Sequence, residues 1–171
     1  MAITINGSGI TSSEIADGTI VNADINSSAA IASSKLSGTG KVLQVVQGLY
    51  TTNFNTTSTS YVDTGLSASI TPSSTSSKIL ALVSQQGFKA GISDAYHYQI
   101  LRDSTQVAYT RVQIQTTSQS SAGIYLHKLD SPSTTSAITY KTQVKTDNGQ
   151  SIYFTWDTGS QATLTLMEIA G

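Results

Sequence analysis

The chain has 171 residues and a formal net charge of −1, and only 11% of its side chains are charged. Its nine Lys and Arg residues are scattered, which excludes the concentrated basic surface that binds nucleic acid or an acidic membrane. With no Cys, it has neither disulfides nor thiolate metal sites, so its stability must come from burial or from assembly.

Targeting signals are also missing from the sequence. The first residues have neither the basic nor the apolar region of a signal peptide, and no apolar run approaches the roughly 18 residues of a membrane span. We therefore expect a protein that is assembled in a cytoplasm and does not insert into a membrane.

Residues 1–40 repeat one aliphatic residue every five positions. A period of five fits neither a helix nor a flat strand, but it fits short extended pieces separated by bends. The residue two places before most of these aliphatics is small, for example Ser8, Gly18 and Ala23. After a one-residue slip at the sixth member, the series comprises Ile5, Ile10, Ile15, Ile20, Ile25, Ile31 and Leu36.

One aliphatic residue per five cannot supply a core for a single chain. Burying an Ile contributes about 1.5–3 kcal/mol, whereas ordering five residues costs several kcal/mol of backbone entropy. Three identical chains that meet around one axis would close this deficit. We therefore predict a short trimeric β-structured shaft, with these residues on its axis. The alternatives are a disordered Ser-rich linker and a pentapeptide-repeat solenoid, for which seven pentads are too few.

Residues 41–171 follow a strand pattern with no convincing helix. Alternation sets Ile138, Tyr140 and Val144 against Lys141 and Lys145, and Asn148-Gly149 predicts a hairpin. The apolar run Lys78–Ser84 indicates a strand buried on both faces. The expected strands are Lys41–Tyr50, Ser60–Thr71, Lys78–Ser84, Tyr96–Arg102, Gln106–Val112, Gly123–Leu129, Ala137–Lys145, Ser151–Trp156 and Ala162–Ile169.

Many short strands separated by turn signals predict a β-sandwich, most plausibly a jelly roll. The fold class is therefore all-β, with two parts: a shaft or anchor segment, residues 1–40, and a jelly-roll-like head, residues 41–171. The boundary falls at Gly38-Thr39-Gly40, where two glycines let the chain change direction.

Several segments resemble trimeric fibre proteins of tailed phages, including those of cyanophages. Residues 18–38 look like their shaft segments, and residues 40–46, 57–67 and 70–80 look like the opening of the head that often follows. Residues 164–169 are similar to the last strand of that head. The resemblance implies a trimeric virion appendage whose head is like the jelly roll of tumour necrosis factor and complement proteins.

Little in the sequence points to catalysis. The two His residues, His97 and His127, lie in no zinc pattern or Gly-x-Ser-x-Gly elbow, and most Asp residues occupy predicted turns. We predict no enzyme activity, no metal site and no cofactor. A binding site is more plausible, because residues 86–97 form a predicted loop that combines aromatic and polar side chains. The candidate receptor contacts are Phe88, Tyr96, His97, Trp156 and Asp157.

The sequence favours a homotrimeric tail or baseplate fibre subunit of a virion. Its residues 1–40 would contact other virion proteins, and its head would contact the host surface, with a glycan as candidate ligand. The first alternative is a capsid decoration, cement or head-fibre protein. The second is a free carbohydrate-binding module, which would need no five-residue repeat.

Overall fold

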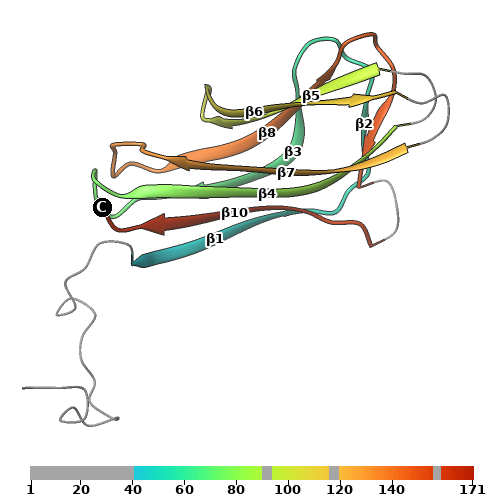
Figure 1. Ribbon diagram of the computed structural model, residues 1–171. Coiled ribbons are helices and arrows are strands. Elements are labelled where there is room, and N and C mark those ends of the chain that lie inside the picture. The colour runs from blue at the N-terminus through green and yellow to red at the C-terminus, as the bar shows by residue number, and fades with distance from the viewer. Residues whose placement is uncertain (1–40, 90–93, 116–119, 156–158) are drawn as a thin grey trace, which may run out of the picture. The chain divides into compact units, whose positions relative to one another are not determined.

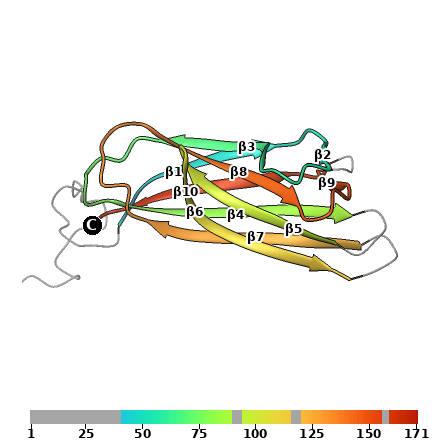
Figure 2. The ribbon, with the colours of Figure 1, turned by 90° about the horizontal axis from the view of Figure 1, so that it is seen from above.

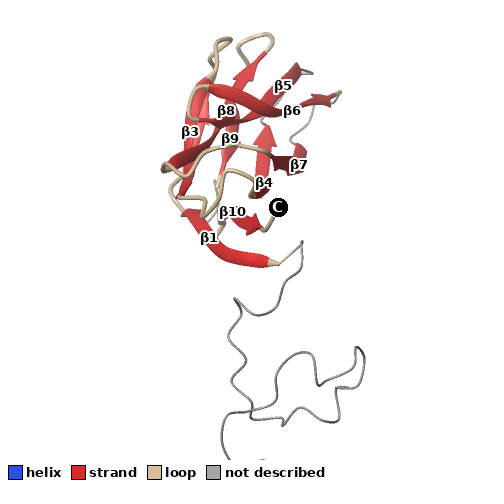
Figure 3. Cartoon of the chain, turned by 90° about the vertical axis from the view of Figure 1, so that its left-hand side faces the viewer, coloured by secondary structure: helices blue, strands red, loops and turns tan. Residues whose placement is uncertain are grey.

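The computed structural model describes residues 41–89, 94–115, 120–155 and 159–171. These residues belong to one unit, Thr39–Gly171. They form strands and connecting loops but no helix, and so no helix that could cross a membrane (Figure 3). The predicted shaft, residues 1–40, lies outside the described residues.

Ten strands form two antiparallel sheets that pack face to face (Figure 1). Sheet A has the order β1-β10-β4-β9-β2, and β7 pairs with the other edge of β4. Its strands are β1 (Val42–Tyr50), β2 (Phe54–Thr56), β4 (Lys78–Lys89), β7 (Ser120–Asp130), β9 (Ile152–Phe154) and β10 (Ala162–Ile169). Sheet B has the order β3-β8-β5-β6, from β3 (Val62–Ile70), β8 (Ile138–Thr146), β5 (Asp94–Arg102) and β6 (Thr105–Ile114).

The eight long strands pair in a nested order. The first pairs with the last (β1 with β10), the second with the seventh (β3 with β8), the third with the sixth (β4 with β7), and the fourth with the fifth (β5 with β6). Nested pairing of this kind, with the pairs divided between two sheets, is the jelly roll. The predicted all-β sandwich is confirmed for the head, and Figure 2 shows its two layers from above.

The core lies between the inner faces of the two sheets and follows the predicted alternation. In β8, Ile138, Tyr140 and Val144 are buried while Lys141 and Lys145 point outward, as expected. The largest fully buried side chains are Tyr96, Tyr98, Tyr140, Phe154, Leu66, Ile79, Ile100, Ile124, Ile152, Leu164 and Leu166.

Two local predictions are wrong. Asn148-Gly149 does make a turn, with Gly149 at φ 72°, but the strands on its two sides belong to different sheets and form no hairpin. Strand β9 pairs instead with β2 and with the end of β4. The predicted loop over residues 86–97 is mostly strand, because β4 continues to Lys89 and β5 begins at Asp94.

The run Lys78–Ser84 is a strand, but only one of its faces is buried. Ile79, Ala81 and Val83 point into the core, whereas Leu80 and Leu82 lie on the outer face of sheet A and are partly exposed. The prediction of burial on both faces therefore does not hold within the described head.

A buried carboxylate lies near the end of sheet A where β10 terminates. Glu168 accepts hydrogen bonds from Ser73 N (2.7 Å), Ser73 Oγ (2.6 Å) and Gln44 Nε2 (2.6 Å). Burial alone would raise the pKa of this carboxyl, but the hydrogen bonds from Ser73 and Gln44 outweigh it and lower the pKa from 4.5 to about 2.

We expect Glu168→Gln to lower the free energy of unfolding by about 1–3 kcal/mol at pH 7, since hydrogen bonds to the charged group are lost. Because the pKa of the folded state is lowered, this stabilisation is present above pH 4.5 and is lost as the pH falls towards 2. Urea denaturation of the wild-type protein and the variant between pH 7 and pH 2 measures this stabilisation. If the difference in their free energies of unfolding stays constant over this range, the lowered pKa of Glu168 is contradicted.

Candidate functional site

A cluster of polar and aromatic side chains lies on the outer face of sheet B. His97 of β5 is opposite Arg111 of β6 on one side and opposite Lys145 of β8 on the other. Side chains of directly opposed residues share one face of a sheet. We call this cluster the sheet B patch; its members are Tyr61, His97, Tyr109, Arg111, Lys145 and Asp147.

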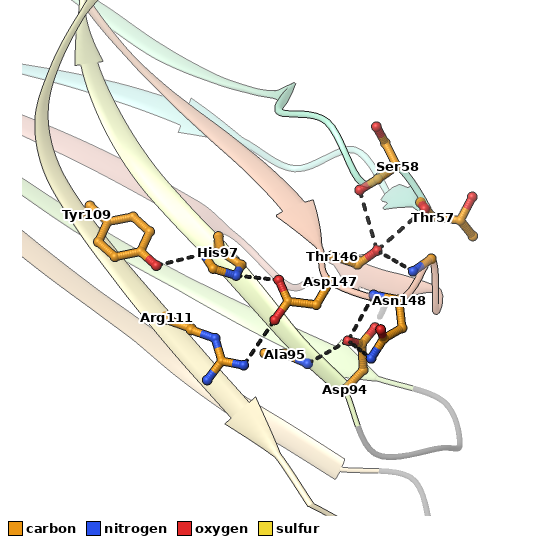
Figure 4. A network of polar contacts seen from close by, with 11 residues as sticks. Thr57, Ser58, Asp94, Ala95, His97, Tyr109, Arg111, Thr146, Asp147 and Asn148 are labelled. Atoms are coloured by element: carbon orange, nitrogen blue, oxygen red, sulfur yellow. Dashed lines mark hydrogen bonds and ion pairs between the residues drawn. The ribbon is translucent and has the colours of Figure 1, made fainter.

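His97 is held through both of its ring nitrogens (Figure 4). Nε2 lies 2.5 Å from Asp147 Oδ1, and Nδ1 lies 2.6 Å from the Tyr109 hydroxyl. An ionised carboxylate only accepts, so Nε2 carries a proton and donates to Asp147. In the neutral ring Nδ1 then accepts from the Tyr109 O–H. These bonds fix the orientation of the imidazole on the sheet.

Asp147 is the anionic centre of the patch. Arg111 Nη2 donates to its Oδ2 at 2.9 Å, while His97 uses its Oδ1. The hydrogen bond from Arg111, together with that from His97, holds the pKa of the Asp147 carboxyl below its ordinary value. The carboxylate is therefore ionised at neutral pH, and both of its oxygens have partners within the patch.

Tyr61 and Lys145 form the neighbouring part of the patch. The Lys145 ammonium lies 5.3 Å from the centroid of the Tyr61 ring, within the range of a cation–π contact. Burial, with Tyr109 and Asp147 nearby, raises the pKa of the Tyr61 hydroxyl. At neutral pH this hydroxyl is therefore uncharged and can both donate and accept.

A second, buried carboxylate supports the turn that carries Asp147. Asp94 Oδ1 accepts from Ala95 N at 2.7 Å and from the backbone and side-chain nitrogens of Asn148 at 3.2 Å each. The backbone N–H of Asp147 donates to Ala95 O at 3.0 Å. The turn is thereby tied to the first residues of β5, so the position of Asp147 is set by the fold (Figure 4).

The order hydroxyl, imidazole and carboxylate in Tyr109, His97 and Asp147 is that of an activated nucleophile. A reaction would also need a cavity and groups that stabilise developing charge, and two hollows on the described head are lined by other residues. Among the described residues, no group of three or more His, Cys, Asp or Glu could hold a metal ion. The exposed aromatic and charged side chains of the patch are of kinds that bind a polar ligand.

The outer face of sheet A differs in character, because a row of apolar side chains crosses it. Val45 of β1 is opposite Met167 of β10, Met167 is opposite Leu80 of β4, and Leu80 is opposite Leu129 of β7. Val45 is 56% exposed and Leu129 50% exposed. We call these four residues the sheet A band. Large exposed apolar side chains also lie nearby on β1, namely Leu43 and Leu49.

An open hollow of about 320 Å³ adjoins the sheet A band on the same face. It is lined by Leu82 and Ser84 of β4, Tyr125 and His127 of β7, and Thr163 and Thr165 of β10. The Tyr125 ring lies over Gly123, where an added Cβ would come within 2.6 Å of it. Tyr125 is nonetheless 78% exposed, a high value for an aromatic residue.

Of the predicted receptor contacts, only Tyr96 and His97 have side chains in the described part of the chain, and these two point to opposite faces of sheet B. Tyr96 is only 1% exposed and packs edge-on against Phe154 at 6.2 Å, so it belongs to the core. His97 reaches the surface as a member of the sheet B patch. Phe88 belongs to β4, but its side chain lies outside the described part, as do Trp156 and Asp157. The predicted axial residues, Ile5 to Leu36, also lie outside it.

Comparisons with known proteins assign no family. No family model and no curated protein match the chain. Among solved structures, a match is the arabinose-bound α-L-arabinofuranosidase MgGH51, with a TM-score of 0.31 and 15% identity. The match covers 71% of this chain and 23% of that chain, so this chain spans less than a quarter of the enzyme's length.

Proposed function

We propose that this protein is a non-enzymatic structural subunit of a virus particle, a homotrimeric fibre protein that attaches the particle to the host surface. Residues 1–40 would form the shaft and contact other virion proteins, and the jelly roll would be the head. The observation that supports this proposal best is the sheet A band, an apolar row on the outer face of a sheet in a chain with few charges.

An exposed apolar face of this kind is costly for a solitary protein. Contiguous apolar patches on soluble proteins usually mark sites where another surface binds. A second and a third copy of the chain would cover the band and the neighbouring Tyr125. The same number of copies would shelter the isoleucines that recur in residues 1–40. One assembly therefore accounts for two independent features, one in each part of the chain.

The two ends of the described head lie at one end of the sandwich, and the sheet B patch is tied to the other end. Lys41, the first described residue of the head, accepts a backbone hydrogen bond from Ala170 N, so the two ends of the described head lie side by side. Strand β4 begins beside the C-terminus, with Lys78 opposite Ile169 of β10, and runs away from it to Lys89 (Figure 1). The turn that carries Asp147 is tied to Asp94, the first residue of β5, and β5 begins at the end of the sandwich where β4 finishes.

Leu129→Asp and Val45→Asp should each convert the trimer to monomers, since carboxylates would be buried at an apolar contact. Both side chains are about half exposed in the single chain, so the fold of the head should survive. Native mass spectrometry of the full chain measures the assembly, and circular dichroism checks the fold. Gln113→Asp, on an exposed residue of β6 in sheet B, is the matched control and should remain trimeric.

A wild-type chain that is monomeric at micromolar concentration would refute the proposal. Unchanged trimers in both variants would instead place the contact elsewhere on the chain. Labelling the protein on purified virus particles then separates a tail fibre from a capsid decoration protein, because the label would appear on the tail in the first case and on the head shell in the second.

A further inference from the structure

The geometry points to a saccharide-binding site in the sheet B patch, and we propose that its ligand is a sugar that carries a carboxylate. This inference rests on the proposed function and names the chemical class of the host ligand. If trimer contacts cover the outer face of sheet A, the outer face of sheet B is the broad surface that remains available to a host cell.

The charges of the patch favour an anion. Arg111 and Lys145 contribute two cations against one carboxylate, Asp147, in a chain whose net charge is −1. Asp147 is already bonded to His97 and Arg111, so its charge is compensated inside the patch. The Arg111 side chain is 45% exposed and uses Nη2 for Asp147, which leaves the other donors of its guanidinium for a ligand.

The aromatic side chains favour a sugar ring over a simple anion. Tyr109 is 44% exposed and Tyr61 is partly exposed, and both lie beside the cations. The C–H faces of a pyranose stack on aromatic rings, while hydroxyl groups read its edges. A carboxylate on the same ring would pair with Arg111 or Lys145 in a charge-assisted hydrogen bond.

Hydrogen bonds within the protein hold the side chains of the patch in place, which lowers the entropy lost on binding. His97 fixes Tyr109 and Asp147, and the turn after β8 is fixed by Asp94. Next to the patch, Gln99 donates to Gln143 at 2.8 Å and Gln143 donates to Asp63 at 2.7 Å, so amide groups continue the polar face across sheet B.

The test is calorimetric titration of the full-length protein with three probes. Oligogalacturonate has both the ring and the carboxylate, its methyl ester keeps the ring without the charge, and polyglutamate keeps the charge without the ring. We expect oligogalacturonate to bind at least about tenfold more tightly than either of the others, because each lacks one of the two contacts.

Substitutions locate the site on the patch. Arg111→Ala and Lys145→Ala should each weaken oligogalacturonate binding about tenfold, and Tyr109→Ala should weaken it by a similar factor. Lys141→Ala is the matched control, since Lys141 is a cation on the same face that is paired with Asp63 at 3.0 Å. The affinity of this variant for oligogalacturonate should be unchanged. Circular dichroism and native mass confirm that each variant is folded and assembled.

Three results would overturn the inference: no binding of oligogalacturonate, equal binding of its methyl ester, or unchanged affinity in both Arg111→Ala and Lys145→Ala. These outcomes are separate from those that test the proposed function. A trimer on virus particles that ignores oligogalacturonate would overturn the ligand assignment alone, whereas a monomer that binds it would overturn the trimer alone.

Discussion

Phe154→Ala is expected to lower the free energy of unfolding by about 3–5 kcal/mol, the cost of emptying the space of a fully buried aromatic ring. Phe154 is 0% exposed, and its ring centroid lies 6.1 Å from that of Phe54, 6.2 Å from that of Tyr96 and 5.9 Å from that of Tyr98. Phe54 and Phe154 belong to sheet A, whereas Tyr96 and Tyr98 belong to sheet B. The ring therefore joins the two sheets.

Chemical denaturation at one fixed protein concentration measures this cost, since the stability of an oligomer depends on concentration. Phe154→Leu is the matched control: it keeps most of the apolar volume and should cost much less, about 1.5 kcal/mol or below. Equal losses in the two variants would mean that the ring packing between the sheets contributes little.

Alternation of apolar and polar residues was sufficient to predict the sandwich. The side-chain period of a strand is two, so Tyr140 and Val144 had to share the inner face while Lys141 and Lys145 shared the outer one. The alternation does not tell which of the two sheets a strand joins. The turn at Asn148-Gly149 has the local chemistry of a hairpin, yet β9 pairs with β2, which lies about 100 residues earlier in the sequence. It also pairs with the end of β4, about 65 residues earlier.

The candidate site was predictable only in part for the same reason. His97 was predicted as a candidate receptor contact, but its neighbours Tyr109 and Arg111 depend on the register between β5 and β6. Asp147 was interpreted as an ordinary turn residue, and the turn places its carboxylate beside the imidazole. Tyr96 could have been excluded from the sequence, because neighbours in a strand point to opposite faces and His97 points outward.

The apolar run Lys78–Ser84 was correctly predicted to be a strand, but burial of both its faces was not confirmed. Both faces of β4 are apolar, but the head covers the inner face alone. Leu80 and Leu82 are left on the outer face of sheet A. A strand that is apolar on both faces is expected where both are covered, and the proposed trimer would cover the outer face of β4.

Asp130→Asn should destabilise the protein by about 3 kcal/mol, because it removes the charge from an ion pair that is largely buried between the sheets. Asp130 Oδ2 accepts from Arg102 Nη1 at 2.6 Å and from the Tyr140 hydroxyl at 2.7 Å. The Asp130 side chain is 11% exposed and that of Arg102 is 22% exposed. Asp130 ends β7 of sheet A, while Arg102 and Tyr140 belong to sheet B.

Asp63→Asn is the matched control, since Asp63 forms an exposed pair with Lys141 on the face of sheet B. Exposed pairs contribute about 1 kcal/mol or less, so the cost of this substitution should be small. Urea denaturation of both variants at pH 7 and fixed concentration compares them directly. Similar costs would contradict the idea that burial makes the Asp130 pair important.

A double substitution identifies the origin of the loss. If Asp130→Asn is costly because Arg102 is left as an unpaired, partly buried charge, then adding Arg102→Met should recover part of the stability. If the pair is instead favourable in itself, the double variant should be no more stable than Asp130→Asn alone. The first outcome is expected, because an apolar side chain of similar length can fill the same space without the cost of desolvating a charge.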